Sequence, residues 1–150
     1  MSTRSKRCPL CEKGTVSPVP SREPMPFRHV TALQPAWPVR VPTCDRCHER
    51  FINTATARAL DEALEAALAT LHRKLVVEAI ERLGGVHTER QWEKRLGLSP
   101  GYLSRLKAGK ESSVALTTLL VMLGQSPARQ WSQIGALWSD SGPEHARLSG

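Results

Sequence analysis

The prolines of this chain are concentrated near its N-terminus, and they exclude a long helix there. Eight of the 11 prolines lie between Pro9 and Pro42. Each proline removes a backbone donor and disfavours the helical conformation of the residue before it. We therefore expect short strands and turns in this region, with strands around residues 15–16, 27–33 and 39–41.

The next part of the chain has the opposite character and predicts one long helix. From Thr43 to Leu83 there is neither glycine nor proline. Asn53 or Thr54 is a suitable N-cap, and the following run is rich in strong helix formers. Gly84-Gly85 then ends the helix. Leucines recur on one face at steps of three and four residues; they are Leu60, Leu64, Leu68, Leu71 and Leu75.

Four shorter helices are predicted downstream, each with its own start signal. They are residues 88–96, capped by Thr88; 99–108, capped by Ser99 with Pro100 in the first helical position; 112–123, capped by Ser112 or Ser113 and ending before Gly124; and 126–138, opened by Ser126-Pro127 and ending near Trp138. We expect the last residues to form a frayed tail.

Four cysteines form two Cys-x-x-Cys pairs with 32 residues between them. Each such turn, which we call a knuckle, aims two thiolates at one ion, and two knuckles complete a tetrahedral site. We predict that Cys8, Cys11, Cys44 and Cys47 bind one structural Zn²⁺ per chain. An N-terminal segment with so few large apolar residues needs such a staple. A closed four-thiolate site has no open position for water, which argues against catalytic zinc.

Two alternative interpretations of these cysteines explain less. A redox dithiol would use one pair beside a βαβ pattern, and no such pattern is visible. Residues 44–48 spell Cys-Asp-Arg-Cys-His, the c-type haem attachment motif, but this leaves Cys8 and Cys11 unexplained and requires export. The basic N-terminus runs into cysteine and proline rather than an apolar segment. No stretch of the sequence approaches the roughly 18 apolar residues of a membrane span. We therefore expect no membrane span and a cytoplasmic, nucleoid-associated location.

The sequence ERQWEKRLGLSPGYLSRLK, beginning at Glu89, is typical of two short helices joined by a glycine turn. Gly97 occupies the turn, where a left-handed conformation is needed, and Leu98 follows it toward the core. Apolar residues share one face in each helix; they are Trp92, Leu96, Leu103 and Leu106. An ordinary αα-corner is the alternative interpretation of this segment.

Charge favours a polyanionic partner for this segment. The whole chain has a formal net charge of +7, and residues 88–110 hold six basic and two acidic side chains. A basic surface of this kind is the electrostatic footprint of nucleic-acid binding. The six basic residues lie off the apolar faces and are expected to be free to meet phosphate; they are Arg90, Lys94, Arg95, Arg105, Lys107 and Lys110.

The motifs resemble known families. Residues 88–110 with their flanking helices resemble the Cro/CI-like (XRE) helix-turn-helix domain over residues 72–139, which implies five helices and a second motif helix in the major groove. The two Cys-x-x-Cys pairs resemble the YgiT-type zinc finger. In this order, the two parts resemble the MqsA-type antitoxins. That resemblance implies a homodimer that binds operator sites in double-stranded DNA, and a zinc domain that can hold a toxin protein. The chain departs from the family pattern at Glu89, where Gln is usual, and at Glu93, where a small Ala is usual.

Within this resemblance we predict a set of DNA-binding residues: Arg90, Ser99, Gly101, Tyr102, Ser104, Arg105, Lys107 and Lys110. Arg105 is assigned to base readout, because its guanidinium matches guanine O6 and N7; contact with phosphate alone is the alternative. Ser99 caps the second helix, whose N-terminus can meet a phosphate. Lys107 and Lys110 are assigned to phosphate contacts.

Several apolar and imidazole side chains have ordinary interpretations. Two faces are candidates for a dimer seam or for intrachain packing: the leucines Leu64, Leu68, Leu71 and Leu75, and the set Trp131, Ile134 and Trp138. Four histidines are expected to be surface residues: His29, His72, His87 and His145. No catalytic constellation stands out, so we expect no enzyme.

Together these signals predict a mainly α protein with a small N-terminal β zinc ribbon. We expect a zinc ribbon over residues 1–52, a linker helix over 53–71, a five-helix Cro/CI-like helix-turn-helix domain over 72–139 and a tail over 140–150. The predicted function is sequence-specific transcriptional regulation by an autorepressing, type II antitoxin-like protein. The alternative is a zinc-ribbon adaptor whose helical domain binds a protein instead of DNA.

Overall fold

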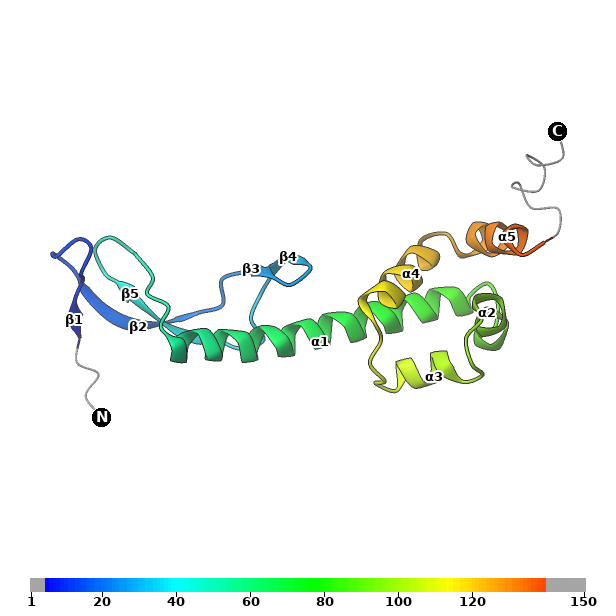
Figure 1. Ribbon diagram of the computed structural model, residues 1–150, viewed down its shortest axis with the longest axis horizontal. Coiled ribbons are helices and arrows are strands. Elements are labelled where there is room, and N and C mark those ends of the chain that lie inside the picture. The colour runs from blue at the N-terminus through cyan, green and yellow to red at the C-terminus, as the bar shows by residue number, and fades with distance from the viewer. Residues whose placement is uncertain (1–4, 140–150) are drawn as a thin grey trace, which may run out of the picture. The chain divides into compact units, whose positions relative to one another are not determined.

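The computed structural model describes residues 5–139 of the chain (Figure 1). These residues form five helices and two small antiparallel sheets. The described residues divide into two compact units, with the boundary between Thr70 and Leu71. The division falls inside the long helix α1 (Thr54–Gly84), whose two halves belong to different units.

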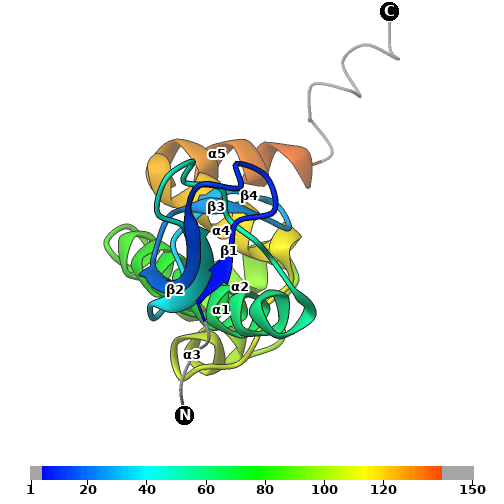
Figure 2. The ribbon, with the colours of Figure 1, turned by 90° about the vertical axis from the view of Figure 1, so that its left-hand side faces the viewer.

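The N-terminal unit is built from short strands, as the prolines predicted. Strands β1 (Lys6–Arg7), β2 (Thr15–Ser21) and β5 (Val39–Cys44) form one sheet in the order β1-β2-β5. Figure 2 shows β1 and β2 side by side. Strands β3 (Met25–Phe27) and β4 (Val30–Leu33) form a second hairpin. The segment between the two cysteine pairs therefore consists of short strands and turns, as expected. The strand expected around residues 27–33 is instead divided into β3 and β4 by a turn at Arg28 and His29.

The register of the sheet explains how its strands tolerate proline. Pro18 lies opposite Pro42, and the Pro42 carbonyl accepts a 2.8 Å hydrogen bond from Phe51 N–H on the other side of β5. The N–H and C=O groups of one residue in an antiparallel strand point to the same side. Pro18 and Pro42 are therefore a non-hydrogen-bonded pair, in which neither residue needs to donate to the other strand. Pro20, two residues after Pro18, also lies in a non-hydrogen-bonded pair, because the two kinds of pair alternate along the strands.

The first half of α1 packs within the N-terminal unit. Asn53 Oδ1 accepts a 2.8 Å hydrogen bond from Thr56 N–H, so Asn53 is the N-cap. Ala36 N–H donates to the Ala63 carbonyl at 3.0 Å, and Leu64 and Leu68 are buried. This half of the helix, expected to be a linker, belongs to the core of the unit. The leucine stripe is thus largely used for packing inside the chain.

The C-terminal unit contains the end of α1 and four shorter helices. These are α2 (Glu89–Leu96), α3 (Tyr102–Lys107), α4 (Val114–Gln125) and α5 (Pro127–Leu137). Their shared core consists of Val76, Ala79, Ile80, Leu83, Trp92, Leu103, Leu106, Leu120 and Leu123. The four downstream helices were predicted, and Thr88 and Ser113 cap α2 and α4 with side-chain hydrogen bonds.

Two predicted boundaries are wrong. Ser99 does not cap α3: its carbonyl accepts from Tyr102 N–H at 3.1 Å, so residues 99–101 form a turn, and Gly101 is the N-cap at φ 78°. Gly124 does not stop α4, which continues to Gln125. A Cβ at Gly124 would lie 3.5 Å from Ala79 Cα. That distance is ordinary van der Waals contact, so α4 packs against α1 at Gly124 and does not end there.

The aromatic residues also differ from expectation. His87 is half-buried rather than on the surface, and its ring stacks on Trp131 with centroids 3.8 Å apart. Trp131 packs edge-on against Trp92 at 4.9 Å. Trp138, a candidate for the core or for a dimer interface, is 79% exposed just after α5, so it is not part of the core of the chain. His145 and the predicted tail from residue 140 lie outside the described residues. None of the described helices combines the length and apolar character that crossing a membrane requires.

Candidate metal centre and candidate nucleic-acid interface

The four cysteine sulfurs converge, as their spacing predicted. All four Sγ atoms lie within 4.8 Å of one another. The Cys8–Cys47 and Cys11–Cys44 sulfur pairs are both 3.7 Å apart. Four sulfurs at about 2.3 Å from one Zn²⁺ would be roughly 3.8 Å apart along each tetrahedral edge. The cluster therefore has the donor set and the size of one tetrahedral metal site.

The two knuckles have equivalent backbone geometry. Glu12 and His48, the residues after the second cysteine of each pair, both adopt left-handed conformations, at φ 54° and 59°. Glu12 N–H donates to the Cys8 carbonyl at 3.0 Å, and His48 N–H donates to the Cys44 carbonyl at 3.2 Å. His48 is thus the residue that closes the second knuckle. This accounts for it without the haem motif.

Gly14 and Asp45, which the sequence analysis did not single out, hold the knuckles together. A Cβ at Gly14 would lie 2.7 Å from Asp45 Oδ1 and 2.8 Å from Arg46 Cβ, and would collide with the Cys44 sulfur. Asp45 Oδ1 accepts from Thr15 N–H at 2.8 Å, and Asp45 N–H donates to the Thr15 carbonyl at 3.1 Å. The sequence feature that could have identified Gly14 is its position three residues after the first Cys-x-x-Cys pair.

Protonation differs sharply between two of the sulfurs. Backbone hydrogen bonds from Lys13 and Gly14 lower the pKa of Cys11 from 9.0 to about 6. A backbone hydrogen bond from Glu49 favours the Cys47 thiolate. Desolvation and the three neighbouring sulfurs outweigh it and raise the pKa of Cys47 from 9.0 to about 12. Metal binding needs thiolates, so a metal ion entering at neutral pH must displace the proton of Cys47.

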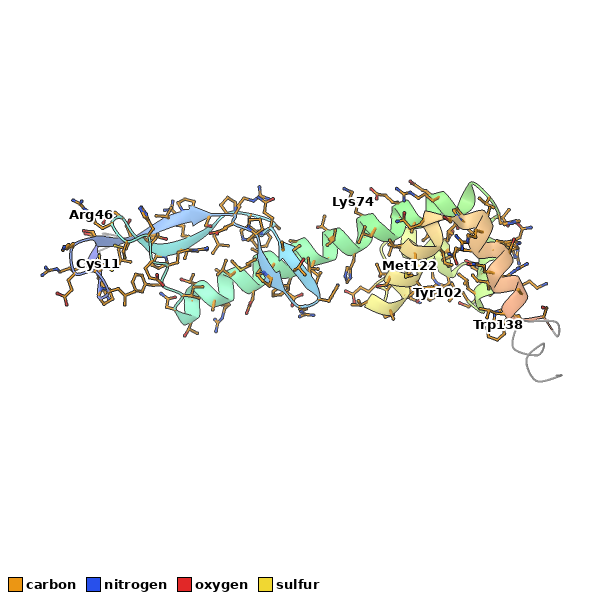
Figure 3. All side chains as sticks on the ribbon, turned by 90° about the horizontal axis from the view of Figure 1, so that it is seen from above. Cys11, Arg46, Lys74, Tyr102, Met122 and Trp138 are labelled. Carbon is orange, nitrogen blue, oxygen red and sulfur yellow. The ribbon has the colours of Figure 1, made fainter. Side chains whose placement is uncertain are left out.

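One side of the cluster is open to solvent. Cys8 and Cys44 are buried, Cys11 is half-buried and Cys47 is exposed. Cys11 and Cys47 line a hollow of about 400 Å³ together with Lys13 and Arg46. Figure 3 shows Cys11 and Arg46, one from each knuckle, at the same end of the N-terminal unit. The two basic side chains offset part of the negative charge that four thiolates would place there.

The second candidate site is the pair of helices α2 and α3. Thr88 and Gln91 form a reciprocal capping box at the start of α2. Gly97 ends α2 in the left-handed conformation at φ 70°, as predicted, and Leu98 packs against the core. In α3, Leu103 and Leu106 are fully buried, whereas Ser104 and Arg105 between them are exposed. The helix thus has one core face and one polar face.

Most of the predicted DNA-binding residues lie on or beside this polar face, and several contact one another. Arg105 Nη2 donates to Ser99 Oγ at 3.1 Å, and a Cβ at Gly101 would lie 3.6 Å from Arg105 Nη1. The Lys110 ammonium lies 4.3 Å from the centre of the Tyr102 ring. The Arg105 guanidinium carbon lies 5.8 Å from the centre of the same ring, which connects the two groups. We call the resulting surface the α3 surface; it consists of Ser99, Gly101, Tyr102, Arg105 and Lys110.

Two of the remaining predicted residues, Ser104 and Lys107, contact Glu89. Its carboxylate forms an ion pair with Lys107 and accepts a 3.3 Å hydrogen bond from Ser104 Oγ. Arg90 is exposed on the first turn of α2. Arg95, expected to be free for phosphate, is not free. Its guanidinium stacks 3.8 Å from the centre of the Trp131 ring, and its Nη1 donates to the Trp131 carbonyl at 2.8 Å.

Glu93 stands at a position where a small Ala is usual in the resembled pattern, and a glutamate on a helix normally faces solvent. The side chain is instead 3% exposed. Its carboxylate accepts from Gly101 N–H at 3.0 Å and from Leu103 N–H at 2.9 Å. The two helices therefore pack around a buried carboxylate.

The sequence matches no described protein family, and no curated protein is similar to it.

Proposed function

We propose that this protein is a sequence-specific DNA-binding transcriptional regulator in which α3 contacts the major groove. The two faces of α3 are the observation that carries the proposal. Leu103 and Leu106 anchor the helix in the core. The α3 surface presents an arginine, a lysine and a serine to solvent beside the half-buried ring of Tyr102. Arginine and lysine supply phosphate contacts, and arginine also matches guanine.

The metal in this proposal is one structural Zn²⁺ held by Cys8, Cys11, Cys44 and Cys47. Four sulfur donors at a tetrahedral spacing favour zinc, which is redox-inert and accepts such a set without distortion. When bound, zinc would supply folding energy to a sheet whose strands are short. The protein performs no catalysis in this proposal, because four cysteine thiolates fill the coordination shell of zinc and leave no position for a substrate.

The more specific version of the proposal is an antitoxin-like repressor of its own operon. It rests on the order of the two units, a cysteine cluster followed by the α2–α3 pair, which resembles the MqsA-type antitoxins. Such a repressor binds a two-fold operator as a homodimer. Light scattering on the intact protein, with and without duplex DNA, tests this version. A strict monomer at tens of micromolar in both conditions would refute it.

One observation favours the adaptor alternative. Helix α4 contains no charged residue, and Leu119 and Met122 on it are 42% and 63% exposed. Exposed apolar side chains on a surface without charge are typical of protein contacts. In this alternative α4 binds a partner protein, and the basic residues near α3 serve solubility.

Duplex binding measured against salt concentration separates the two functions. A DNA-binding protein loses affinity linearly on logarithmic axes as salt rises, with a slope of about −0.9 for each phosphate contact. We expect that behaviour for the wild type, and a shallower slope for Lys110→Ala. As a matched control we use Lys74→Ala, which removes an exposed lysine from α1. Weak binding at every salt concentration would refute DNA binding and leave the adaptor function.

A further inference from the structure

Glu93 holds both ends of the turn between α2 and α3. Its backbone carbonyl accepts from Leu98 N–H at 2.8 Å, which helps to close the C-terminus of α2 together with the Gly97 cap. Its side-chain carboxylate accepts from Gly101 and Leu103 N–H groups at the start of α3. One residue therefore bonds the end of one helix and the beginning of the next.

The beginning of α3 depends on this carboxylate because its own cap is missing. Gly101 occupies the N-cap position and has no side chain to accept a hydrogen bond. Ser99, the residue expected to serve, turns its hydroxyl to Arg105 instead. The first N–H groups of a helix have no acceptor within the helix. For Gly101 and Leu103 the acceptor is the Glu93 carboxylate on α2.

The carboxylate itself is stabilised mainly by this arrangement. Glu93 is 3% exposed, and the ion pairs in the described part of the chain do not include it. A buried carboxylate needs compensation, and here it comes from two N–H groups and the positive end of α3. The dependence is mutual: α3 needs the carboxylate, and the buried carboxylate needs α3 in this position.

We propose that Glu93 is a positioning residue that fixes the direction of α3 relative to α2, so that base discrimination by the α3 surface depends on it. This rests on the proposed DNA-binding function, because the discrimination belongs to α3. Glu93 is buried and does not touch DNA itself. Arg105 donates a hydrogen bond to Ser99, which lies in the turn that Glu93 holds. A shift of this turn would therefore move the Arg105 guanidinium relative to the base that it contacts.

The first test is amide hydrogen exchange on Glu93→Gln. The substitution keeps the shape of the side chain but replaces one acceptor oxygen by a donor that faces an N–H group. We expect the amide that faces the new NH₂ group, Gly101 or Leu103, to exchange roughly tenfold faster or more, since hydrogen bonds to charged groups are among the stronger ones. The Leu106 amide should be unchanged. Glu78→Gln, an exposed glutamate on α1 of the same unit, is the matched control.

The second test measures discrimination between duplexes. A preferred duplex is selected from a random pool with the wild-type protein, and its affinity is compared with that for a scrambled duplex. Folded Glu93→Gln should lose about tenfold in this ratio while keeping its salt slope. A purely structural role would lower both affinities alike. Wild-type exchange rates at Gly101 and Leu103 together with unchanged discrimination would overturn the proposal.

Two further outcomes of these tests also have a defined interpretation. If Glu93→Gln does not fold, Glu93→Asp is used: its shorter side chain reaches only one of the two N–H groups, so one amide should lose protection. Equal protection of both amides in that variant would overturn the proposal. If the wild type prefers no duplex, the regulator function fails, and the exchange rates still decide whether Glu93 positions α3.

Discussion

The two knuckles meet at Gly14, and the distances there allow the effect of Gly14→Ala on metal binding to be estimated. Gly14→Ala would place a methyl group 2.7 Å from Asp45 Oδ1 and 2.8 Å from Arg46 Cβ, in collision with the Cys44 sulfur. None of these atoms can move away easily, because Asp45 is bonded to Thr15 through both its side chain and its backbone. The second knuckle must therefore shift as a whole.

Overpacking of this kind costs about 1–3 kcal/mol. Because folding of the N-terminal unit and metal binding are coupled, this cost should appear as weaker metal binding. It corresponds to a loss of roughly 5- to 150-fold in metal affinity. The backbone of Gly14 is not in the left-handed region, so the whole effect is steric.

Competition with a chromogenic chelator measures the apparent zinc affinity of Gly14→Ala against the wild type. The control is Gly84→Ala, since a Cβ at Gly84 would meet nothing within 4 Å. It should leave zinc affinity unchanged and leave stability the same or slightly higher. Limited proteolysis should show earlier cleavage of the N-terminal unit only in Gly14→Ala. Equal zinc affinity for both variants would mean that the knuckles do not meet at Gly14.

Other predictions address each site. Cys47→Ser should abolish stoichiometric zinc and expose the N-terminal unit to protease while the helical unit stays protected; zinc-free protein with a protected N-terminal unit would contradict this. Apparent zinc affinity should rise with pH from about 6 to 8, because Cys47, with its pKa raised to about 12, must release a proton on binding whereas Cys11, at about 6, is already ionised over most of that range; a pH-independent affinity would be inconsistent with these pKa values. Arg105→Ala should cost about 1–3 kcal/mol on a preferred duplex and flatten discrimination at one base pair; equal losses on preferred and scrambled duplexes would reassign Arg105 to phosphate. Glu89→Gln should raise affinity for all duplexes and steepen the salt slope, because it frees the lysine that the carboxylate holds; an unchanged slope would show that this ion pair does not compete with phosphate.

Features that depend on neighbours in the chain were predictable from the sequence. Thr88 caps α2 through the N–H of Gln91, three residues away, and Gly97 takes the left-handed conformation that ends a helix. The proline-rich segment formed strands because proline excludes helix, and the cysteine spacing was sufficient to predict that four sulfurs meet. In each case the controlling interaction lies within a few residues or in a motif whose spacing specifies the geometry.

Features that depend on distant partners were decided only by the tertiary structure. Arg95 was counted among the phosphate ligands, but its partner is Trp131, 36 residues away. Gly14 matters because Cys44 and Asp45 arrive beside it from the second knuckle. A glutamate on a helix normally faces solvent, and Glu93 turns inward only because the α2–α3 turn aims two N–H groups at it. A polar side chain is buried only where a hydrogen-bond partner is available in the interior. That partner is in place only once the helices have packed.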